Sequence, residues 1–207
     1  MNSSSSSKLI EEAVDQMSSL PGIGRKTALR LVLHLLDRET HEISRFSNSF
    51  TKLKSEIKFC KKCRNISDDE LCSICNAKGR DHSLICVVQD IRDILAIEST
   101  SQYFGSYHVL GGVISPMDGI GPNDLNITSL IERVSENDIS EIIIALKGNM
   151  EGETTGFYLF RKLSPFQTKV TTIARGIAVG DDLEYADEIS LGRSILNRSP
   201  YSDSVAK

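Results

Sequence analysis

The first part of the chain carries apolar residues at the spacing of two amphipathic helices. One set comprises Leu9, Ile10, Ala13, Val14 and Met17. The other comprises Ala28, Leu31, Val32, Leu35 and Leu36. Because residues three and four apart share one face of a helix, the pattern predicts helical structure within residues 8–46. Residues 20–24, which contain a proline and two glycines, predict a tight break between the two helices.

Beyond residue 83 the pattern changes to short apolar runs that alternate with amphipathic stretches. Strands are predicted at 84–88, 107–110, 141–146 and 169–174. Helices are predicted at about 91–98, 124–134 and 153–163, with a last one around 187–196. Strands that alternate with helices favour a mainly parallel sheet with helices on both faces. The predicted fold class is therefore α/β, with helices before the sheet and a helical segment after it.

The composition is that of a globular chain without a membrane span. The 207 residues are 40% hydrophobic and 25% charged, and no window holds the roughly 18 apolar residues that a span requires. The serine-rich start, residues 1–7, has no apolar stretch behind it, so we expect a disordered tail and not a secretion signal. We expect a cytoplasmic protein.

Charge is distributed unevenly along the chain. The formal net charge of −4 argues against a uniformly basic coat for nucleic acid. Residues 1–64 nevertheless carry 12 Lys and Arg against 7 Asp and Glu, a net of +5, whereas residues 65–207 carry a net of −9. A polyanion is therefore expected to meet the first part of the chain.

Four cysteines form two C-x2-C pairs separated by eight residues. They are Cys60, Cys63, Cys72 and Cys75. Two such knuckles point four thiolates at one centre and predict a structural Zn²⁺ site with no open position for water. Lys58, Lys61, Lys62 and Arg64 lie nearby, and their positive charge favours the thiolate form. The alternatives are two disulfides, which an intracellular chain disfavours, or a redox pair. Cys86 falls within an apolar strand and is expected to be a packed core thiol.

The break at residues 20–24 joins the two helices in the pattern of a helix-hairpin-helix motif. Gly22 and Gly24 permit a sharp turn and a close approach of another molecule. The second helix then begins with unpaired N–H groups, which together with its dipole favour a phosphate. The predicted DNA-binding residues are Gly22, Gly24, Arg25, Lys26, Arg30 and Arg38. Such a site contacts the backbone and not the bases, so we expect binding to single- and double-stranded DNA without sequence preference.

This hairpin also allows other interpretations. Similar hairpins serve only as helix connectors or protein contacts. The stripe of Lys26, Arg30, His34 and Arg38, expected opposite the leucines, would by itself indicate only a solvated face. The sequence 24–27 has a faint likeness to a phosphate-binding P-loop, but the spacing differs and a helix precedes it, which excludes that motif.

The α/β segment resembles the Toprim domain of topoisomerases and primases. The resemblance rests on the strand that ends at Val88 before Gln89 and Asp90, and on a later strand followed by Glu151 and Glu153. Catalytic members place a Glu after the first strand and an Asp-x-Asp after the later one, where the Asp pair holds Mg²⁺. Here Gln89 cannot ionise and two glutamates replace the aspartates. The resemblance therefore implies a non-catalytic domain, with weak Mg²⁺ binding left open.

Taken in order, the motifs resemble the RecR family of bacterial recombination mediators over roughly residues 8–200. The signatures are LPGIGRKTALRL (20–31), CKKCRNISDDELCSIC (60–75), RDHSLICVV (80–88), HVLGGVISPMDGIGP (108–122), GNMEGETT (148–155) and ARGIAVGDDLEYADEISLGRSIL (174–196). Gln89, where this family is expected to have Glu, is the clearest departure.

The resemblance implies a non-enzymatic DNA-binding protein of recombinational repair. It implies a homo-dimer or a tetramer ring that acts as a clamp with RecO, and in many bacteria RecF, to load RecA onto gapped DNA coated by single-strand-binding protein. The stretch 174–187 resembles the family's Walker-B-like segment. Without a P-loop, ATP hydrolysis is not expected, and residues 181–184 are more simply a polar turn and helix start.

Four domains are predicted. Residues 1–50 form the helix-hairpin-helix region with its disordered start, and 51–80 the four-cysteine zinc finger. Residues 81–175 form the Toprim domain, and 176–207 the Walker-B-like segment with a helix. The competing hypotheses are a Toprim-type Mg²⁺-dependent nuclease or nucleotidyl-transfer enzyme, and a protein scaffold that does not bind DNA.

Overall fold

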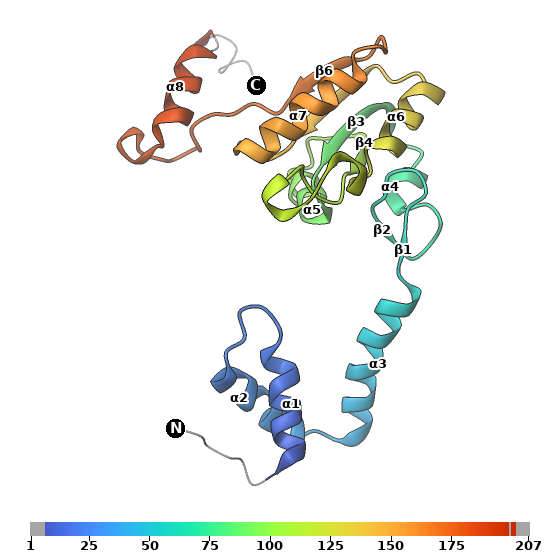
Figure 1. Cartoon of the computed structure of the whole chain (residues 1–207), viewed down its shortest axis with the longest axis vertical. Coiled ribbons are helices and arrows are strands. Elements are labelled where there is room, and N and C mark those ends of the chain that lie inside the picture. Colours follow the sequence, from blue (N-terminus) through green and yellow to red (C-terminus); the bar gives the residue numbers. More distant parts are fainter. Residues whose placement is uncertain (1–6, 199, 202–207) are drawn as a thin grey trace. The chain divides into compact units, whose positions relative to one another are not determined.

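The computed structural model describes residues 7–198 and 200–201 and divides into two compact units, residues 1–57 and 58–207 (Figure 1). We call them the helical unit and the finger-sheet unit. Most of the predicted serine-rich tail, and the polar end beyond residue 201, lie outside the described residues. Within the described ranges, no helix is both long and apolar enough to span a bilayer.

The helical unit contains α1 (Lys8–Ser18), α2 (Arg25–Leu36) and α3 (Thr40–Glu56). The first two confirm the predicted helices on either side of a break. Their shared core consists of Val14, Ala28 and Val32. The helical region extends beyond the predicted end at residue 46, because α3 continues to Glu56. The prediction missed this part because its apolar residues are exposed and do not mark a buried face. The prediction also missed that Leu36 is 68% exposed.

The finger-sheet unit starts with a small cysteine-bearing element. Strands β1 (Lys58–Phe59) and β2 (Ile66–Ser67) pair antiparallel, and a short helix α4 (Ser73–Asn76) follows. The hydrophobic core of this element consists of its four cysteines, with Ile74 packed against them. So small an apolar core gives this element little stability from packing alone.

A four-stranded sheet of order β4-β3-β5-β6 forms the centre of this unit (Figure 1). All three of its strand pairs are parallel. The strands are β3 (Asp81–Val88), β4 (Gly105–Val109), β5 (Glu141–Ala145) and β6 (Lys169–Thr172). Each overlaps one predicted strand. Val88 pairs with Val109 on one side and Ala145 on the other, so three strands end at one edge of the sheet.

Helices cover both faces of the sheet, which confirms the α/β fold class. Because side chains alternate along a strand, Ile85 and Val87 enter one core while Cys86 and Val88 enter the other. The first core includes residues of α6 (Ile127–Glu136) and α7 (Met150–Leu163), and the second includes Ile94 of α5 (Ile91–Ser99). Burial raises the pKa of the Cys86 thiol to about 12, as expected for a packed core cysteine.

The last described segment passes through a turn into α8 (Glu188–Leu196). Gly180 has a φ of +94°, which glycine adopts without strain. Asp182 precedes a single 3-10 turn at Leu183–Tyr185, in agreement with the predicted polar turn. Asp187 accepts a hydrogen bond of 2.9 Å from the backbone N–H of Ser190 and so caps α8.

Candidate functional site

The hairpin between α1 and α2 exposes its backbone. Gly22 has a φ of +83°, a conformation that favours glycine. Gly24 differs, because it is extended (φ −76°, ψ 158°) and a Cβ built there would meet no atom within 4 Å. Nothing within the described structure therefore requires glycine at position 24. Gly24 precedes the first turn of α2 and provides no side-chain cap, so the first N–H groups of that helix remain open to a ligand.

All four predicted basic contacts of the hairpin lie on the surface, but they differ in their partners. Arg25 forms an ion pair with Asp15, and Arg38 donates a hydrogen bond of 3.3 Å to Nε2 of His34. Lys26 and Arg30 are exposed and form no ion pair among the described residues. An exposed pair such as Arg25–Asp15 contributes about 1 kcal/mol or less, so a phosphate competes readily for the guanidinium.

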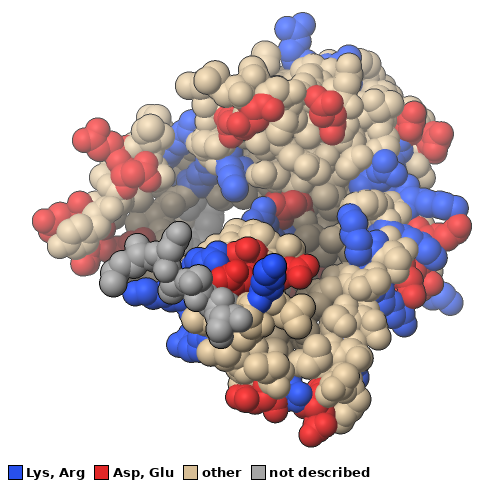
Figure 2. Space-filling model, turned by 60° about the horizontal axis from the view of Figure 1, so that its bottom comes forward, with Lys and Arg blue, Asp and Glu red and all other residues tan. Residues whose placement is uncertain are grey.

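Charges of both signs are interspersed on the face of the molecule in Figure 2. Two of the basic residues predicted to surround the cysteines are engaged with other side chains. Lys61 pairs with Glu70 at 2.6 Å, and Arg64 donates from Nε to Oδ1 of Asn126 at 3.1 Å. Lys58 is exposed and Lys62 is partly exposed. The positive charge available near the finger is therefore smaller than the sequence suggested.

The structure brings the four predicted metal-ligating cysteines together. Their sulfur atoms lie within 4.8 Å of one another, and all four residues are buried. The Sγ atoms of Cys63 and Cys72 are 3.5 Å apart. A tetrahedral zinc ion with bonds of about 2.3 Å separates its sulfurs by about 3.8 Å, so the donor set and its spacing fit zinc. The backbone N–H of Cys75 also points at Sγ of Cys72, at 3.5 Å.

The residue that follows the first knuckle is unusual for its backbone. Arg64 has a φ of +63°, a left-handed conformation that non-glycine residues rarely adopt. Its side chain reaches Asn126, which precedes α6 and also donates to the carbonyl of Val109 at 3.1 Å. The N–H of Val109 in turn donates to the carbonyl of Cys63 at 2.8 Å. These bonds fasten the cysteine element to strand β4.

The acidic residues at the carboxyl edge of the sheet are all engaged within the protein. Asp90 caps α5 and pairs with Arg92, whose hydrogen bond holds the pKa of Asp90 below its ordinary value. Glu151 accepts a hydrogen bond of 2.8 Å from the hydroxyl of Ser115. Gln89 leaves its Oε1 buried without a partner among the described residues.

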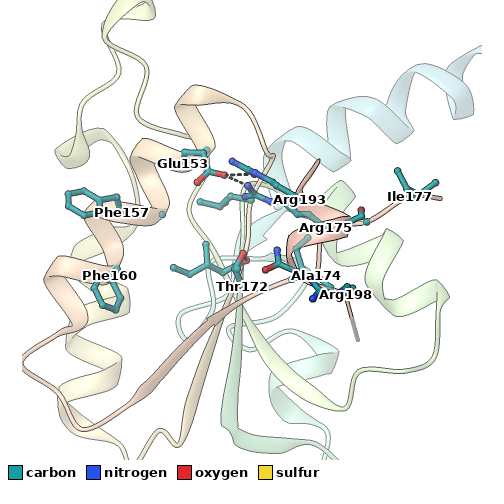
Figure 3. A pocket seen from close by; sticks show the side chains of 17 residues that line it. Glu153, Phe157, Phe160, Thr172, Ala174, Arg175, Ile177, Arg193 and Arg198 are labelled. Atoms are coloured by element: carbon teal, nitrogen blue, oxygen red, sulfur yellow. Dashed lines mark hydrogen bonds and ion pairs between the residues drawn. The ribbon is translucent and has the colours of Figure 1, made fainter. Parts of the chain in front are cut away.

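Glu153 forms ion pairs with Arg175 and with Arg193, the latter at 3.6 Å (Figure 3). These two arginines belong to the segment after β6 and to α8, so the C-terminal segment is attached to the start of α7. A cavity of about 810 Å³ lies beside the pairs and is lined by Phe157 and Phe160 as well. The carboxylate of Glu153 is thus neutralised by cations of the same chain.

Reasoning from the sequence missed several residues of these sites. Arg175 was recognisable only as a charge after the last strand, and its pairing with Glu153 depends on strand order. Arg133 and Asn126 were also missed. Arg133 stands three residues after Leu130 on the apolar face of a predicted helix, and a cation on such a face was an available signal.

Comparison with protein families divides the chain into four matches. The description "RecR, helix-hairpin-helix" matches residues 10–53, and the four-cysteine zinc finger domain of RecR matches 57–77. "Toprim domain" matches 83–174, and "RecR, C-terminal" matches 176–199. The hairpin and the cysteine cluster each fall within one match, and the parallel sheet falls within the Toprim match except for the first two residues of β3.

Curated relatives match over nearly the whole length. The Recombination protein RecR of Bacteroides thetaiotaomicron is 59% identical over 205 residues, which cover 99% of this chain and 100% of the relative. That of Porphyromonas gingivalis is 58% identical over 200 residues, 97% of each chain. The chain belongs to the RecR family. The RecR of Flavobacterium johnsoniae is 56% identical over 196 residues, 95% of each chain, and the family resemblance of the sequence motifs is confirmed.

Proposed function

We propose that the chain is a DNA-binding recombination mediator of recombinational repair and not an enzyme. Support comes from the helix-hairpin-helix match and from relatives named for recombination. In this proposal the protein acts with RecO, and with RecF where the cell has it, to load RecA onto gapped DNA coated with single-strand-binding protein. It works in the cytoplasm, at the nucleoid, where that DNA lies.

The observation that carries the DNA-binding proposal is the open surface at Gly24. A glycine in an ordinary extended conformation, with free space where a Cβ would lie, is explained by a molecule that approaches from outside. The adjoining N–H groups at the start of α2 and the exposed cations of Lys26 and Arg30 suit a phosphate. Gly22 shapes the turn, while Arg25 and Arg38 add contacts after release from their partners.

Fluorescence anisotropy on gapped DNA at low salt tests this interface. We expect Lys26→Ala/Arg30→Ala to weaken binding and to reduce the log–log salt slope by about 1.8, since each lost phosphate contact contributes about 0.9. The matched control is Arg161→Ala/Lys162→Ala, which removes two cations from the last turn of α7 and should leave the slope unchanged. Equal slopes for the hairpin variant and the wild type would contradict this interface, and no binding by the wild type would favour a scaffold that does not bind DNA.

The proposal includes self-association into a dimer or a tetramer ring that encircles DNA as a clamp. Exposed apolar side chains on α2 and α3 support it. They are Leu29, Leu33, Leu36, Phe46, Phe50 and Leu53. One hairpin contacts few phosphates, and several hairpins in one assembly raise the effective concentration of each. Native mass spectrometry tests the assembly, and a monomer at micromolar concentration would contradict it.

The absence of catalysis is supported by the engaged state of the carboxylates. Glu153 is neutralised by two arginines, Glu151 is bound to Ser115, and Gln89 cannot ionise. Any Mg²⁺ binding at Glu151 and Glu153 is therefore weak and non-catalytic in this proposal. Incubation of labelled DNA with Mg²⁺ or Mn²⁺ tests it. A cleavage or transfer product that disappears in Glu153→Ala would instead favour a Toprim-type nuclease or nucleotidyl-transfer enzyme.

The proposal also assigns the finger and the acidic surfaces. Cys60, Cys63, Cys72 and Cys75 bind one structural Zn²⁺ per chain, which fits the spacing of their sulfurs. Lys58 and Lys62 provide secondary DNA contacts. The acidic surfaces of residues 65–207, which carry a net charge of −9, suit a partner with a basic face, and RecO is the candidate. The four-domain division predicted from the sequence belongs to this proposal.

A further inference from the structure

Arg133 is a buried cation with no acidic partner among residues 7–198 and 200–201. It lies on α6, is only 6% exposed, and is flanked by the buried Leu130 and Val134. Its guanidinium donates from Nη1 to the carbonyl of Tyr107 at 2.7 Å and from Nη2 to the hydroxyl of Ser106 at 2.6 Å. Both acceptors are neutral, and Arg133 forms no ion pair within the described part of the chain. Its Nε is buried without a hydrogen-bond partner there.

A buried guanidinium of this kind requires a compensating negative charge. Arginine remains protonated in proteins, so it cannot lose its charge on burial as lysine or histidine can. Transfer of an unpaired ion into the interior is strongly unfavourable, and one neutral hydrogen bond on each terminal nitrogen offsets that only in part. The surroundings of Arg133 should therefore contain an anion.

The edge of β4 that Arg133 contacts identifies that anion. Residues two apart in a strand present their backbone groups to the same edge. The carbonyl of Tyr107 accepts from Arg133, and two residues later the N–H of Val109 donates to the carbonyl of Cys63 at 2.8 Å. Strand β3 occupies the other edge of β4. The guanidinium and the first cysteine knuckle thus meet the same edge of β4.

The cysteine cluster also contacts the core beside Arg133. Ile74 packs both against the four cysteines and against the core that contains Tyr107 and Val109. Burial lowers the pKa of the Arg133 guanidinium, and the thiol groups of Cys75 and Cys63 act in the opposite direction by favouring its charged form. A zinc ion with four thiolates has a net charge of −2.

We propose that Arg133 is the buried counter-charge of the four-cysteine zinc centre and that this attraction holds the finger on the edge of β4. This inference rests on the zinc site proposed above and not on DNA binding. Arg133 is a positioning residue that acts on the metal through its charge. It stabilises the dianionic cluster, and the cluster in turn makes a buried arginine tolerable beside β4.

Neighbouring cations do not fulfil this role. His108 is fully buried, and burial lowers its pKa to about 4, so it is neutral near pH 7. Arg64 is exposed, and its Nε is bonded to Asn126. Lys61 is exposed and pairs with Glu70. Arg133 is thus the fully charged and buried group among these four.

The test measures how fast the full-length protein releases zinc to a chromophoric chelator. We expect Arg133→Met, which preserves the length and apolar stem, to release zinc about tenfold faster or more, as loss of an outer-shell partner typically does. Arg133→Lys retains the charge and should restore part of the difference. The matched control, Leu130→Ala, damages the same buried face of α6 without changing a charge and should stay within about twofold of the wild type.

A second background separates charge from packing. Cys75→His replaces a thiolate with a neutral ligand and reduces the negative charge of the cluster from −2 to −1, so Arg133→Met should have a smaller effect there. If Arg133→Met is soluble only in the Cys75→His background, that also supports the proposal. Insolubility in both backgrounds contradicts it, because the defect would then be independent of the cluster's charge.

The remaining outcomes are equally decisive. Zinc release from Arg133→Met at the wild-type rate contradicts the role of Arg133 as counter-charge. Release from Leu130→Ala that is as fast as release from Arg133→Met contradicts it as well. Purified protein without zinc overturns the zinc site as well. Loss of DNA binding in Lys26→Ala/Arg30→Ala with unchanged zinc release leaves this inference intact, so the two proposals fail separately.

Discussion

The helical unit and the parallel sheet bury apolar surface in different ways. The core of α1 and α2 has three buried residues, whereas leucines and phenylalanines of α2 and α3 remain exposed. The sheet has a separate buried cluster on each face. Because stability derives mainly from buried apolar area, the sheet is stable by its own packing. The helical unit instead leaves apolar side chains of α2 and α3 exposed.

The cysteine element is a third case between these two. Its core is four sulfurs and Ile74, so neither its own apolar packing nor a large partner surface explains its order. The proposed zinc ion and the hydrogen bonds to β4 explain why this element is ordered. A comparison of stability among the three regions therefore separates the contributions of metal binding, apolar packing and association.

The largest effect is expected from loss of a zinc ligand. Cys72 caps α4 and provides one of the four sulfurs, so Cys72→Ser should abolish zinc binding worth about 10 kcal/mol or more. Atomic emission should show about one zinc per wild-type chain and almost none in the variant. Limited proteolysis should then cut within residues 58–77 first. Full zinc content in Cys72→Ser would contradict the ligand assignment.

A core substitution in the sheet should have the next largest effect. Leu159 is fully buried on α7, so Leu159→Ala should lower the free energy of unfolding by about 3 kcal/mol, as measured by urea denaturation. Leu33→Ala, at a side chain that is 44% exposed, should change it by about 0.5 kcal/mol or less and shift the native mass toward smaller species. Similar losses in both variants would erase the contrast between the two regions.

Acid should weaken the sheet through His108. Its pKa is about 4 in the folded protein, against about 6.5 when unfolded, so below pH 6.5 the unfolded chain binds the proton first. Stability is therefore unaffected above that range and falls as the pH drops from 6.5 to 4. The expected loss at pH 5 is about 2 kcal/mol.

Urea denaturation at pH 7 and pH 5 measures this loss. His108→Gln retains a donor toward the carbonyl of Asn126, to which Nε2 donates at 2.8 Å, and should remove about 2 kcal/mol of the pH dependence. His41→Gln, at an exposed position on α3, should keep the wild-type dependence. An unchanged profile in His108→Gln would refute the assignment.

The smallest effects are expected from two glycines of the hairpin. Gly24→Ala should leave stability unchanged or slightly higher, because its backbone is ordinary, yet reduce DNA affinity several-fold by crowding the phosphate. Gly22→Ala should lower stability by about 1 kcal/mol because its φ is +83°. Thermal denaturation and anisotropy distinguish the two. Unchanged DNA affinity in Gly24→Ala would remove the main support for the interface.

Local patterns of apolar residues predicted the helices and strands well where that pattern reflects the face that the element buries. The helical spacing of Val14, Ala28 and Val32 reflects the face that α1 and α2 bury, and the alternation of Ile85 and Cys86 reflects the two cores of the sheet. The C-x2-C spacing likewise predicted the cluster. The extent of α3 was missed because its apolar residues face outward, where no core reveals them.

The sequence by itself determined the α/β class, the hairpin glycines and the set of metal-ligating cysteines, because each depends on residues close together in the chain. Only the tertiary structure decided which charges meet. Glu153 with Arg175, Arg64 with Asn126, and the burial of Arg133 at the edge of β4 join residues that lie far apart in the sequence. Such pairs depend on strand order and on the path of the backbone, which local periodicity does not encode.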